Sequence, residues 1–199
     1  MFLSQLRKVK ERDDMNKILY IHGFGSSYKP DSNKIRIMSE TYEVVGMSYD
    51  YTAPADQNLA ALTKFSNSEK VDMIVGTSLG GWYASQLGCD LGVPSVMINP
   101  AVNPNITLTK YIGENVDHYG NAYTLTQEVV DSYWDFETKG FGLVLIDAGD
   151  EVIDPDSINH VECNYEIKTF EGGNHRFAHM AESMEFIDRH LGKSVVMGF

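Results

Sequence analysis

The sequence is poor in cysteine and has no long apolar run. It contains two cysteines, Cys89 and Cys163, and no CxxC motif. Two thiols in a chain of this length are typical of a reduced protein, which excludes a disulfide framework and thiolate zinc sites. No stretch of about 18 apolar residues occurs, and the N-terminus has no apolar core of signal-peptide length, so we expect no membrane span. These features predict a cytoplasmic protein.

Basic residues are also scarce. The chain has 16 Lys and Arg against 28 Asp and Glu, a formal net charge of −12. Such a surface repels phosphate backbones and anionic lipids, so neither nucleic acid nor a membrane is expected as a partner. A small molecule is the expected partner.

The rest of the composition is that of a globular protein, with 43% hydrophobic and 22% charged residues. The length predicts about one domain, which we assign to residues 15–199. Residues 1–14 are interpreted as an N-terminal extension, either a short amphipathic helix or a disordered tail. Met15 is an alternative start.

Short apolar runs alternate with helical stretches, which predicts an α/β fold with a mostly parallel sheet and helices on both of its faces. Six strands are expected, over 18–21, 43–48, 71–75, 95–98, 143–146 and 165–170. Helices are expected over 30–40, 55–65, 82–91 and 178–191.

The regular alternation breaks between about 101 and 139, a segment too long for an ordinary connection and rich in aromatic residues. We interpret it as a small cap insertion over one edge of the sheet. The alternative is a helical connection that packs its aromatic side chains into the core. Trp82 and Tyr83 are expected to pack their helix against the sheet.

The strongest chemical signal is the GxSxG motif at 76–80, between a predicted strand and a predicted helix. Such a turn exposes a serine hydroxyl, and its small flanking residues let the strand and the helix approach closely. Ser78 is therefore the candidate nucleophile. A glycine-rich turn with a bystander serine is the structural alternative.

His175 lies in the sequence GGNH, after the last predicted strand. Of six histidines, His22 sits inside an HG turn directly at the end of a strand, and His175 is the one in a glycine-rich loop that can swing over the edge of the sheet. His175 is the candidate general base.

A catalytic histidine needs a carboxylate to orient it, just beyond the end of a strand. Asp150 has that position. Asp154, before a proline, is the competitor, with a helix cap as its other possible role. Asp147 lies too far inside the strand, and Glu151 is expected to point elsewhere.

The motif HGFG at 22–25 follows the first predicted strand. An elbow-type enzyme takes one oxyanion N–H from the residue after its nucleophile, here Leu79, and another from a nearby loop, here Phe24. The spacing does not suit a phosphate-binding loop, and Tyr28 stands where a dinucleotide fingerprint needs glycine.

No metal and no cofactor are expected. His175 and His179 are four residues apart, but Arg176 replaces the glutamate that a zincin motif requires. The acidic run from Asp147 to Asp156 lacks EF-hand spacing and is interpreted as a solvated loop. Arg176 has two candidate roles, a contact with an anionic leaving group or a surface salt bridge.

The combined motifs resemble the YqiA-type esterases, which are small α/β-hydrolases. The similarity extends from about 17 to about 190 and is carried by IHGFGSS at 21–27, GTSLGGWYAS at 76–85, INPAVNP at 98–104, KYIG at 110–113, GDEVID at 149–154 and EGGNHRF at 171–177. The resemblance implies a compact α/β-hydrolase fold and esterase activity without a cofactor, with Ser78 as nucleophile, Asp150 as acid and His175 as base. The order of these three residues along the chain agrees with that fold.

The sequence therefore predicts a serine esterase that hydrolyses carboxylic esters or acyl thioesters through an acyl-enzyme. Two alternatives stay open. One is a hydrolase fold that binds a ligand or partner without catalysis, and the other is an acyltransferase that uses the same triad.

Overall fold

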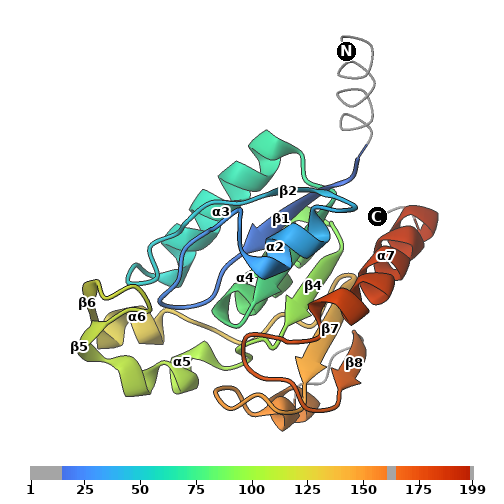
Figure 1. Ribbon diagram of the computed structural model, residues 1–199. Coiled ribbons are helices and arrows are strands. Elements are labelled where there is room, and N and C mark those ends of the chain that lie inside the picture. The colour runs from blue at the N-terminus through green and yellow to red at the C-terminus, as the bar shows by residue number, and fades with distance from the viewer. Residues whose placement is uncertain (1–14, 161–164, 198–199) are drawn as a thin grey trace, which may run out of the picture.

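The computed structural model describes residues 15–160 and 165–197 of the chain. Its centre is a six-stranded sheet with the order β2-β1-β3-β4-β7-β8, in which every neighbouring pair is parallel (Figure 1). The strands are β1 (Lys17–Ile21), β2 (Glu43–Val45), β3 (Met73–Thr77), β4 (Ser95–Ile98), β7 (Gly142–Asp147) and β8 (Glu166–Phe170). The predicted sheet is thus confirmed. The extension predicted for 1–14 lies outside the described residues.

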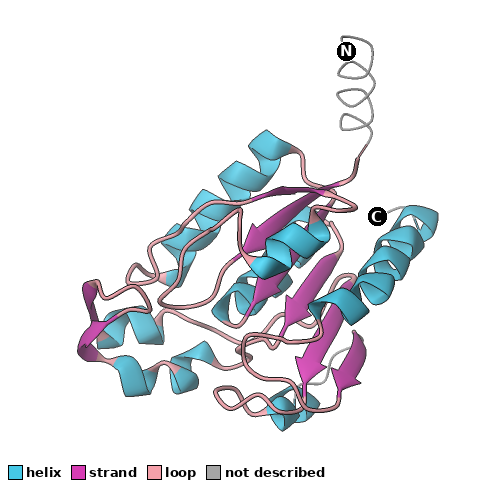
Figure 2. Cartoon of the chain, in the orientation of Figure 1, coloured by secondary structure: helices cyan, strands magenta, loops and turns pink. Residues whose placement is uncertain are grey.

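Helices cover both faces of this sheet (Figure 2). On one face α3 (Ala55–Glu69) and α4 (Leu79–Leu91) share a hydrophobic cluster with the sheet, and on the other α2 (Asn33–Met38) and α7 (Met180–Met197) do so. Strand side chains alternate between the two clusters, which explains the apolar runs without polar alternation. Within the described parts of the chain, no helix is both long enough and apolar enough to cross a bilayer.

Several predicted boundaries differ from the observed ones. The helix expected over 30–40 is limited to Asn33–Met38, and the one expected from residue 82 already begins at Leu79. The last helix continues past Gly192 because helix interiors tolerate a single glycine at a cost of about 1 kcal/mol. The strand expected over 43–48 ends at Val45.

The segment between β4 and β7 contains several short elements. They are α5 (Pro104–Thr107), the 3-10 helix η1 (Thr109–Tyr111), β5 (Gly113–Val116), β6 (Ala122–Leu125) and α6 (Gln127–Asp131). Strands β5 and β6 form an antiparallel hairpin that pairs Gly113 with Leu125 and lies apart from the main sheet (Figure 1).

The two halves of this segment place their aromatic side chains differently. Tyr111 and Tyr123 pack against Phe24, which follows β1, with ring centroids 5.4 and 5.7 Å away. Tyr133 and Phe136 are buried in the core cluster beside α4. The first half thus lies against the loop that follows β1, whereas the second half packs into the core.

Trp82 and Tyr83, both fully buried, link α4 to this second half. The Trp82 indole N–H donates to the Trp134 carbonyl at 3.1 Å, and the Tyr83 and Tyr133 hydroxyls lie 3.0 Å apart. Both rings also belong to the cluster that contains sheet residues. They therefore pack against the insertion as well as the sheet.

Candidate active site

Ser78 occupies the sharp turn between β3 and α4. Its backbone has φ 56° and ψ −122°, a conformation that L residues rarely adopt and that is typical of strained functional turns. A Cβ on Gly76 would lie 1.9 Å from the Gly80 carbonyl oxygen, and one on Gly80 would lie 2.2 Å from the Ile21 carbonyl oxygen. Glycine at both positions is what lets the helix begin directly against the strands.

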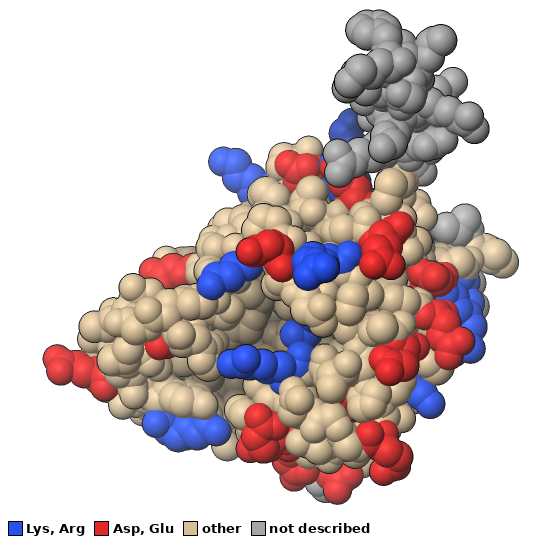
Figure 3. Space-filling view, in the orientation of Figure 1, with Lys and Arg blue, Asp and Glu red and all other residues tan. Residues whose placement is uncertain are grey.

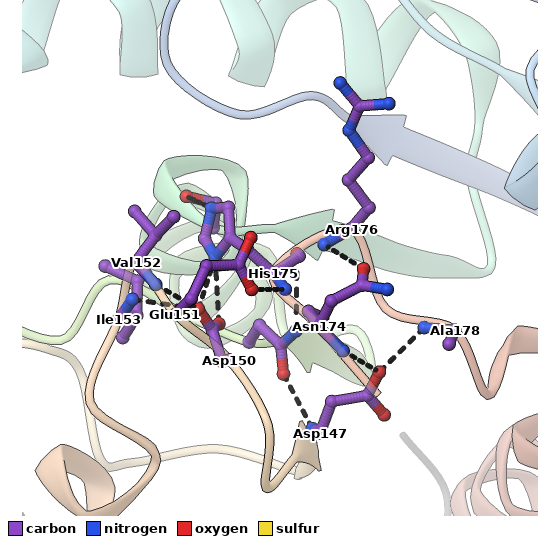
Figure 4. Close-up of polar contacts among 11 residues, drawn as sticks. Asp147, Asp150, Glu151, Val152, Ile153, Asn174, His175, Arg176 and Ala178 are labelled. Atoms are coloured by element: carbon purple, nitrogen blue, oxygen red, sulfur yellow. Dashed lines mark hydrogen bonds and ion pairs between the residues drawn. The ribbon is translucent and has the colours of Figure 1, made fainter. Parts of the chain in front are cut away.

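The three residues predicted to act together each lie within hydrogen-bond distance of another of the three, and Figure 4 shows the Asp150 side chain beside that of His175. His175 Nε2 lies 3.1 Å from Ser78 Oγ, and His175 Nδ1 lies 2.9 and 2.8 Å from the two Asp150 oxygens. The His175 side chain is 21% exposed, whereas that of Asp150 is 2% exposed. The base is therefore reachable from solvent while its carboxylate partner is shielded.

The Asp150 carboxylate decides the tautomer of His175. Burial raises the pKa of Asp150, but hydrogen bonds from His175 and from the Val152 and Ile153 amides outweigh it and hold the pKa below its usual value. An ionised carboxylate only accepts hydrogen bonds, so His175 Nδ1 carries the proton and Nε2 is left as the acceptor. Nε2 can then accept the Ser78 hydroxyl proton.

Asp147 corrects the interpretation of the acidic run as a solvated loop. This carboxylate is fully buried, and it accepts hydrogen bonds from the Asn174 and Ala178 amides at 3.1 and 2.7 Å. It also lies 2.7 Å from His179 Nδ1. Asp147 thus holds the loop on both sides of His175 without contacting that imidazole.

Asn99 adds a second buried attachment for the same loop. Its side-chain N–H donates to the Asn174 and His175 carbonyls at 3.1 and 3.3 Å, and its oxygen accepts from the Asp147 amide at 2.8 Å. The sequence analysis missed this residue. The NP dipeptide that begins at Asn99, directly after a predicted strand, was the available signal.

Glu151 contacts the base, contrary to the expectation that it points elsewhere. Its Oε2 accepts a hydrogen bond from the His175 backbone N–H at 3.0 Å, and this contact lowers the pKa of Glu151. Asp154, the competitor of Asp150, accepts from the Asp156 amide at 3.0 Å at the start of η2 (Pro155–His160). Its position therefore fits the capping alternative.

The HGFG loop lies against the nucleophile turn. A Cβ on Gly23 would be 3.1 Å from Ser78 Cβ, so the backbone that leads into Phe24 passes beside the serine. Among the described residues, neither the Phe24 nor the Leu79 backbone N–H has an acceptor. Both amides are thus free to donate to a ligand next to Ser78.

His22 stabilises the conformation of this loop. The Tyr49 amide donates to its Nε2 at 3.4 Å, so Nδ1 carries the proton and donates to the Gly23 carbonyl at 2.9 Å. The ring stacks on that of Tyr49 at 4.3 Å, and burial lowers the pKa of His22. His22 is therefore a structural histidine below the turn.

Two cavities meet at Ser78 and His175. One, of about 200 Å³, lies under the hairpin and is walled mainly by apolar side chains, including Leu79, Leu108 and Tyr123. The other, of about 650 Å³, extends along α2 and the His175 loop and is walled mainly by polar side chains. His118, in the insertion, borders both cavities, a position that the sequence analysis did not anticipate.

No metal centre is evident in the part of the chain that the structure describes. There, no three His, Cys, Asp or Glu side chains gather in a way that could hold a metal ion. The His175 and His179 side chains turn to different carboxylates, Asp150 and Asp147.

Comparison with solved structures defines the class of this fold. Est1E from Butyrivibrio proteoclasticus superposes with a TM-score of 0.69 at 18% identity, over 92% of this chain and 89% of that one. A monoacylglycerol lipase from Paleococcus ferrophilus gives 0.65 at 12% identity, over 88% and 94%. Mouse alpha/beta hydrolase domain-containing protein 10 gives 0.68 at 13% identity, over 89% and 90%. The chain has the α/β-hydrolase fold.

Within that class, the chain belongs to the uncharacterised protein family UPF0227, the family of the YqiA-type proteins, whose model matches residues 17–191. A UPF0227 protein from Shewanella loihica is 25% identical over 182 residues, 85% of this chain and 97% of its relative. One from Vibrio parahaemolyticus is 24% identical over 175 residues, 84% and 95% of the two chains. The resemblance drawn from the motifs is confirmed.

Proposed function

We propose that this protein is a serine esterase that hydrolyses carboxylic esters or acyl thioesters. The observation that carries the proposal is the continuous hydrogen-bonded chain from Asp150 through His175 to Ser78. The strained backbone of Ser78 is a second support, because it holds the hydroxyl at the meeting point of two cavities. Proteins that share the fold include an esterase domain and a lipase.

In the first half-reaction His175 Nε2 removes the Ser78 proton as Oγ attacks the carbonyl carbon. The Phe24 and Leu79 N–H groups donate to the oxygen that becomes negative; losing one such donor typically costs about 100- to 1000-fold in turnover. His175 then protonates the leaving alcohol or thiol, and the acyl group stays on Oγ. Asp150 keeps the imidazole oriented and stabilises its charged form.

In the second half-reaction water takes the place of the alcohol. His175 removes a proton from the water as its oxygen attacks the acyl-enzyme, and then returns that proton to Ser78 Oγ. The products of this step are the carboxylic acid and the free enzyme, so ester and water are the only reactants.

Labelling with a fluorophosphonate, read by intact mass, tests this proposal. We expect one adduct on the wild type and none on Ser78→Ala, with butyryl-ester hydrolysis reduced about a millionfold in that variant. Ser68→Ala, which removes an exposed hydroxyl on α3, is the matched control and should label normally. No adduct on folded wild type would refute the esterase and favour a non-catalytic binding function.

Hydrolase and acyltransferase share the acyl-enzyme, so labelling does not separate them. Adding an alcohol to the butyryl-ester assay does. An esterase continues to release butyrate as its main product, whereas an acyltransferase forms the new ester in preference.

A further inference from the structure

The larger of the two cavities, here called the cationic cleft, has a charge opposite to that of the whole protein. Three basic side chains line it, Lys29, Lys34 and Arg176, and none of its described lining residues is Asp or Glu, although the chain has 28 acidic residues. Figure 3 shows a hollow in this face with Lys and Arg side chains around it and an acidic side chain at its upper rim. A cleft bordered by one sign of charge concentrates ligands of the other sign.

The three cations are not neutralised by the described part of the protein. There, no carboxylate lies within ion-pair distance of Lys29, Lys34 or Arg176. The Lys29 ammonium lies 3.6 Å from the centre of the Tyr119 ring, and the Arg176 side chain extends away from Asp147 and Asp150 (Figure 4). Arg176 therefore forms no surface salt bridge with any carboxylate that the structure describes.

Lys34, in α2, gives the strongest indication of an anion site because its side chain is half-buried. Burial and the charge of Arg176 lower the pKa of Lys34 to about 8, and Asp147 offsets this only in part. The oxygens of Asp147 already accept bonds from two backbone amides and contact His179. Asp147 is thus already engaged, and a ligand anion bound in the cleft would relieve the repulsion between Lys34 and Arg176.

The position of the cleft relative to Ser78 assigns its ligand to one side of the ester. The small cavity under the hairpin is the apolar one and suits an acyl chain, and the cationic cleft opens from the same serine and imidazole. The leaving group then occupies the cleft. This inference rests on the proposed esterase function.

We propose that the cationic cleft binds an anionic group, a phosphate or carboxylate, on the leaving-group side of the ester. Arg176 donates through a fork that matches such oxygens, and the two lysines supply point charges. The Asn33 side chain borders the same cleft and can add a hydrogen bond, whereas the Ser26 hydroxyl lies 3.1 Å from that of Tyr119.

Three esters with the same acyl group test the proposal: monobutyryl glycerol, butyryl glycerate and butyryl glycerol 3-phosphate. They share the acyl group and a three-carbon leaving group, which is neutral in the first, carries a carboxylate in the second and a phosphate in the third, and butyrate release is measured for each. We expect kcat/KM of at least one anionic ester to exceed that of the neutral one by about tenfold or more. Equal values for all three would overturn the proposal. Hydrolysis of the neutral ester alone reports the esterase itself, so the two failures are distinct.

Variants identify the groups responsible. Lys34→Met and Arg176→Ala should each reduce the ratio of anionic to neutral kcat/KM by about tenfold, and Arg176→Lys should reduce it less. Lys64→Ala removes one positive charge from the exposed surface of α3 and is the control; it should leave the ratio unchanged. An equal fall in Lys64→Ala would mean that net charge, and not the cleft, sets the preference, and would overturn the proposal.

Two further measurements test whether the charge is recognised on the acyl side and whether the cleft binds an anion when no ester is hydrolysed. If a butyl ester of succinate, with its charge on the acyl side, is preferred over butyl butyrate while the glycerol esters are not distinguished, the assignment to the leaving group is wrong. If no ester is hydrolysed, calorimetry with glycerol 3-phosphate decides. Binding that is lost in Lys34→Met supports the cleft as an anion site, and no binding to the wild type overturns it.

Discussion

The Asp147 carboxylate accepts a hydrogen bond from the backbone amide of Asn174, the residue directly before His175. This contact joins the end of β7 to the loop that carries the base, across 27 residues of sequence. Asp147 is therefore a positioning residue in our proposal: it acts on the imidazole through the loop, while Asp150 contacts the ring itself.

Asp147→Asn tests this role. One acceptor oxygen is lost from a fully buried group that serves two amides and contacts His179, so we expect a loss of about 2–4 kcal/mol in the free energy of unfolding, measured in urea. Ester turnover should fall while the Ser78 adduct can still form, because the serine turn is untouched. Asp154→Asn, at an exposed cap, is the control and should change neither quantity much. Wild-type turnover in folded Asp147→Asn would contradict the positioning role.

Glu151 makes a second prediction about the same loop. Glu151→Ala removes the acceptor of the His175 backbone N–H, and Glu151→Gln keeps a side-chain oxygen there. We expect the alanine variant to lose about three- to tenfold in kcat, with KM little changed. The glutamine variant should stay near the wild type. Equal losses in both variants would point to the charge, and not to the hydrogen bond, as the cause.

The nucleophile turn predicts a contrast between two glycines. Gly76→Ala places a Cβ 1.9 Å from the Gly80 backbone oxygen, which cannot move without displacing α4, so we expect an unfolded or insoluble protein. Gly192 lies in α7 with open space at its Cβ position. Gly192→Ala should stabilise the protein by about 0.5–1 kcal/mol, read as a rise in Tm. A well-folded Gly76→Ala would show that the strand and the helix are less tightly joined than described.

His190 predicts a loss of stability in mild acid. The side chain is buried against Phe141, and burial lowers its pKa to about 4, against about 6.5 in an unfolded chain. The unfolded state therefore binds the extra proton. Stability is complete above about pH 6.5 and is lost as the pH falls toward 4, by about 3 kcal/mol in total.

His190→Gln removes this titration and keeps a side-chain N–H for the Phe141 carbonyl, which lies 3.3 Å from His190 Nε2. Urea unfolding at about pH 7 and about pH 5 compares the two proteins, and the variant should lose less stability between them. Equal losses in variant and wild type would mean that other groups, such as buried His22, cause the acid effect.

Local signals were enough to predict most of the fold. Strands β1, β3, β4 and β7 were found because each is an apolar run closed by glycine, proline or a polar turn, and because parallel strands buried on both faces need no alternation. The edge strands β2 and β8 are only partly buried, and β8 mixes charged with apolar residues. The elbow was found because GTSLG combines the tiny residues that such a turn requires. Helix ends were predicted less well; α4 begins at Leu79 because Ser78 already has a turn conformation, which no helical periodicity reveals.

Contacts between distant residues were not predictable in the same way. Asn99 and His175 are 76 positions apart, and their hydrogen bond depends on β4 and β7 being neighbours in the sheet. The burial of Asp147 depends on α7 and the His175 loop closing over the end of its strand. A single sequence contains the side chains but not the pairing order that brings them together.

The sequence by itself determined the order of strands and helices along the chain, the position of the nucleophile turn and the chemical types of the candidate base and acid, because each follows from local sterics or from the chemistry of one side chain. Only the tertiary structure decided which carboxylate faces His175, which one holds its loop, and that three of the few basic residues line one cleft whose described lining includes no Asp or Glu. Burial, ion pairing and cavity shape are properties of side chains from several elements packed together, so they exist only once the chain has folded.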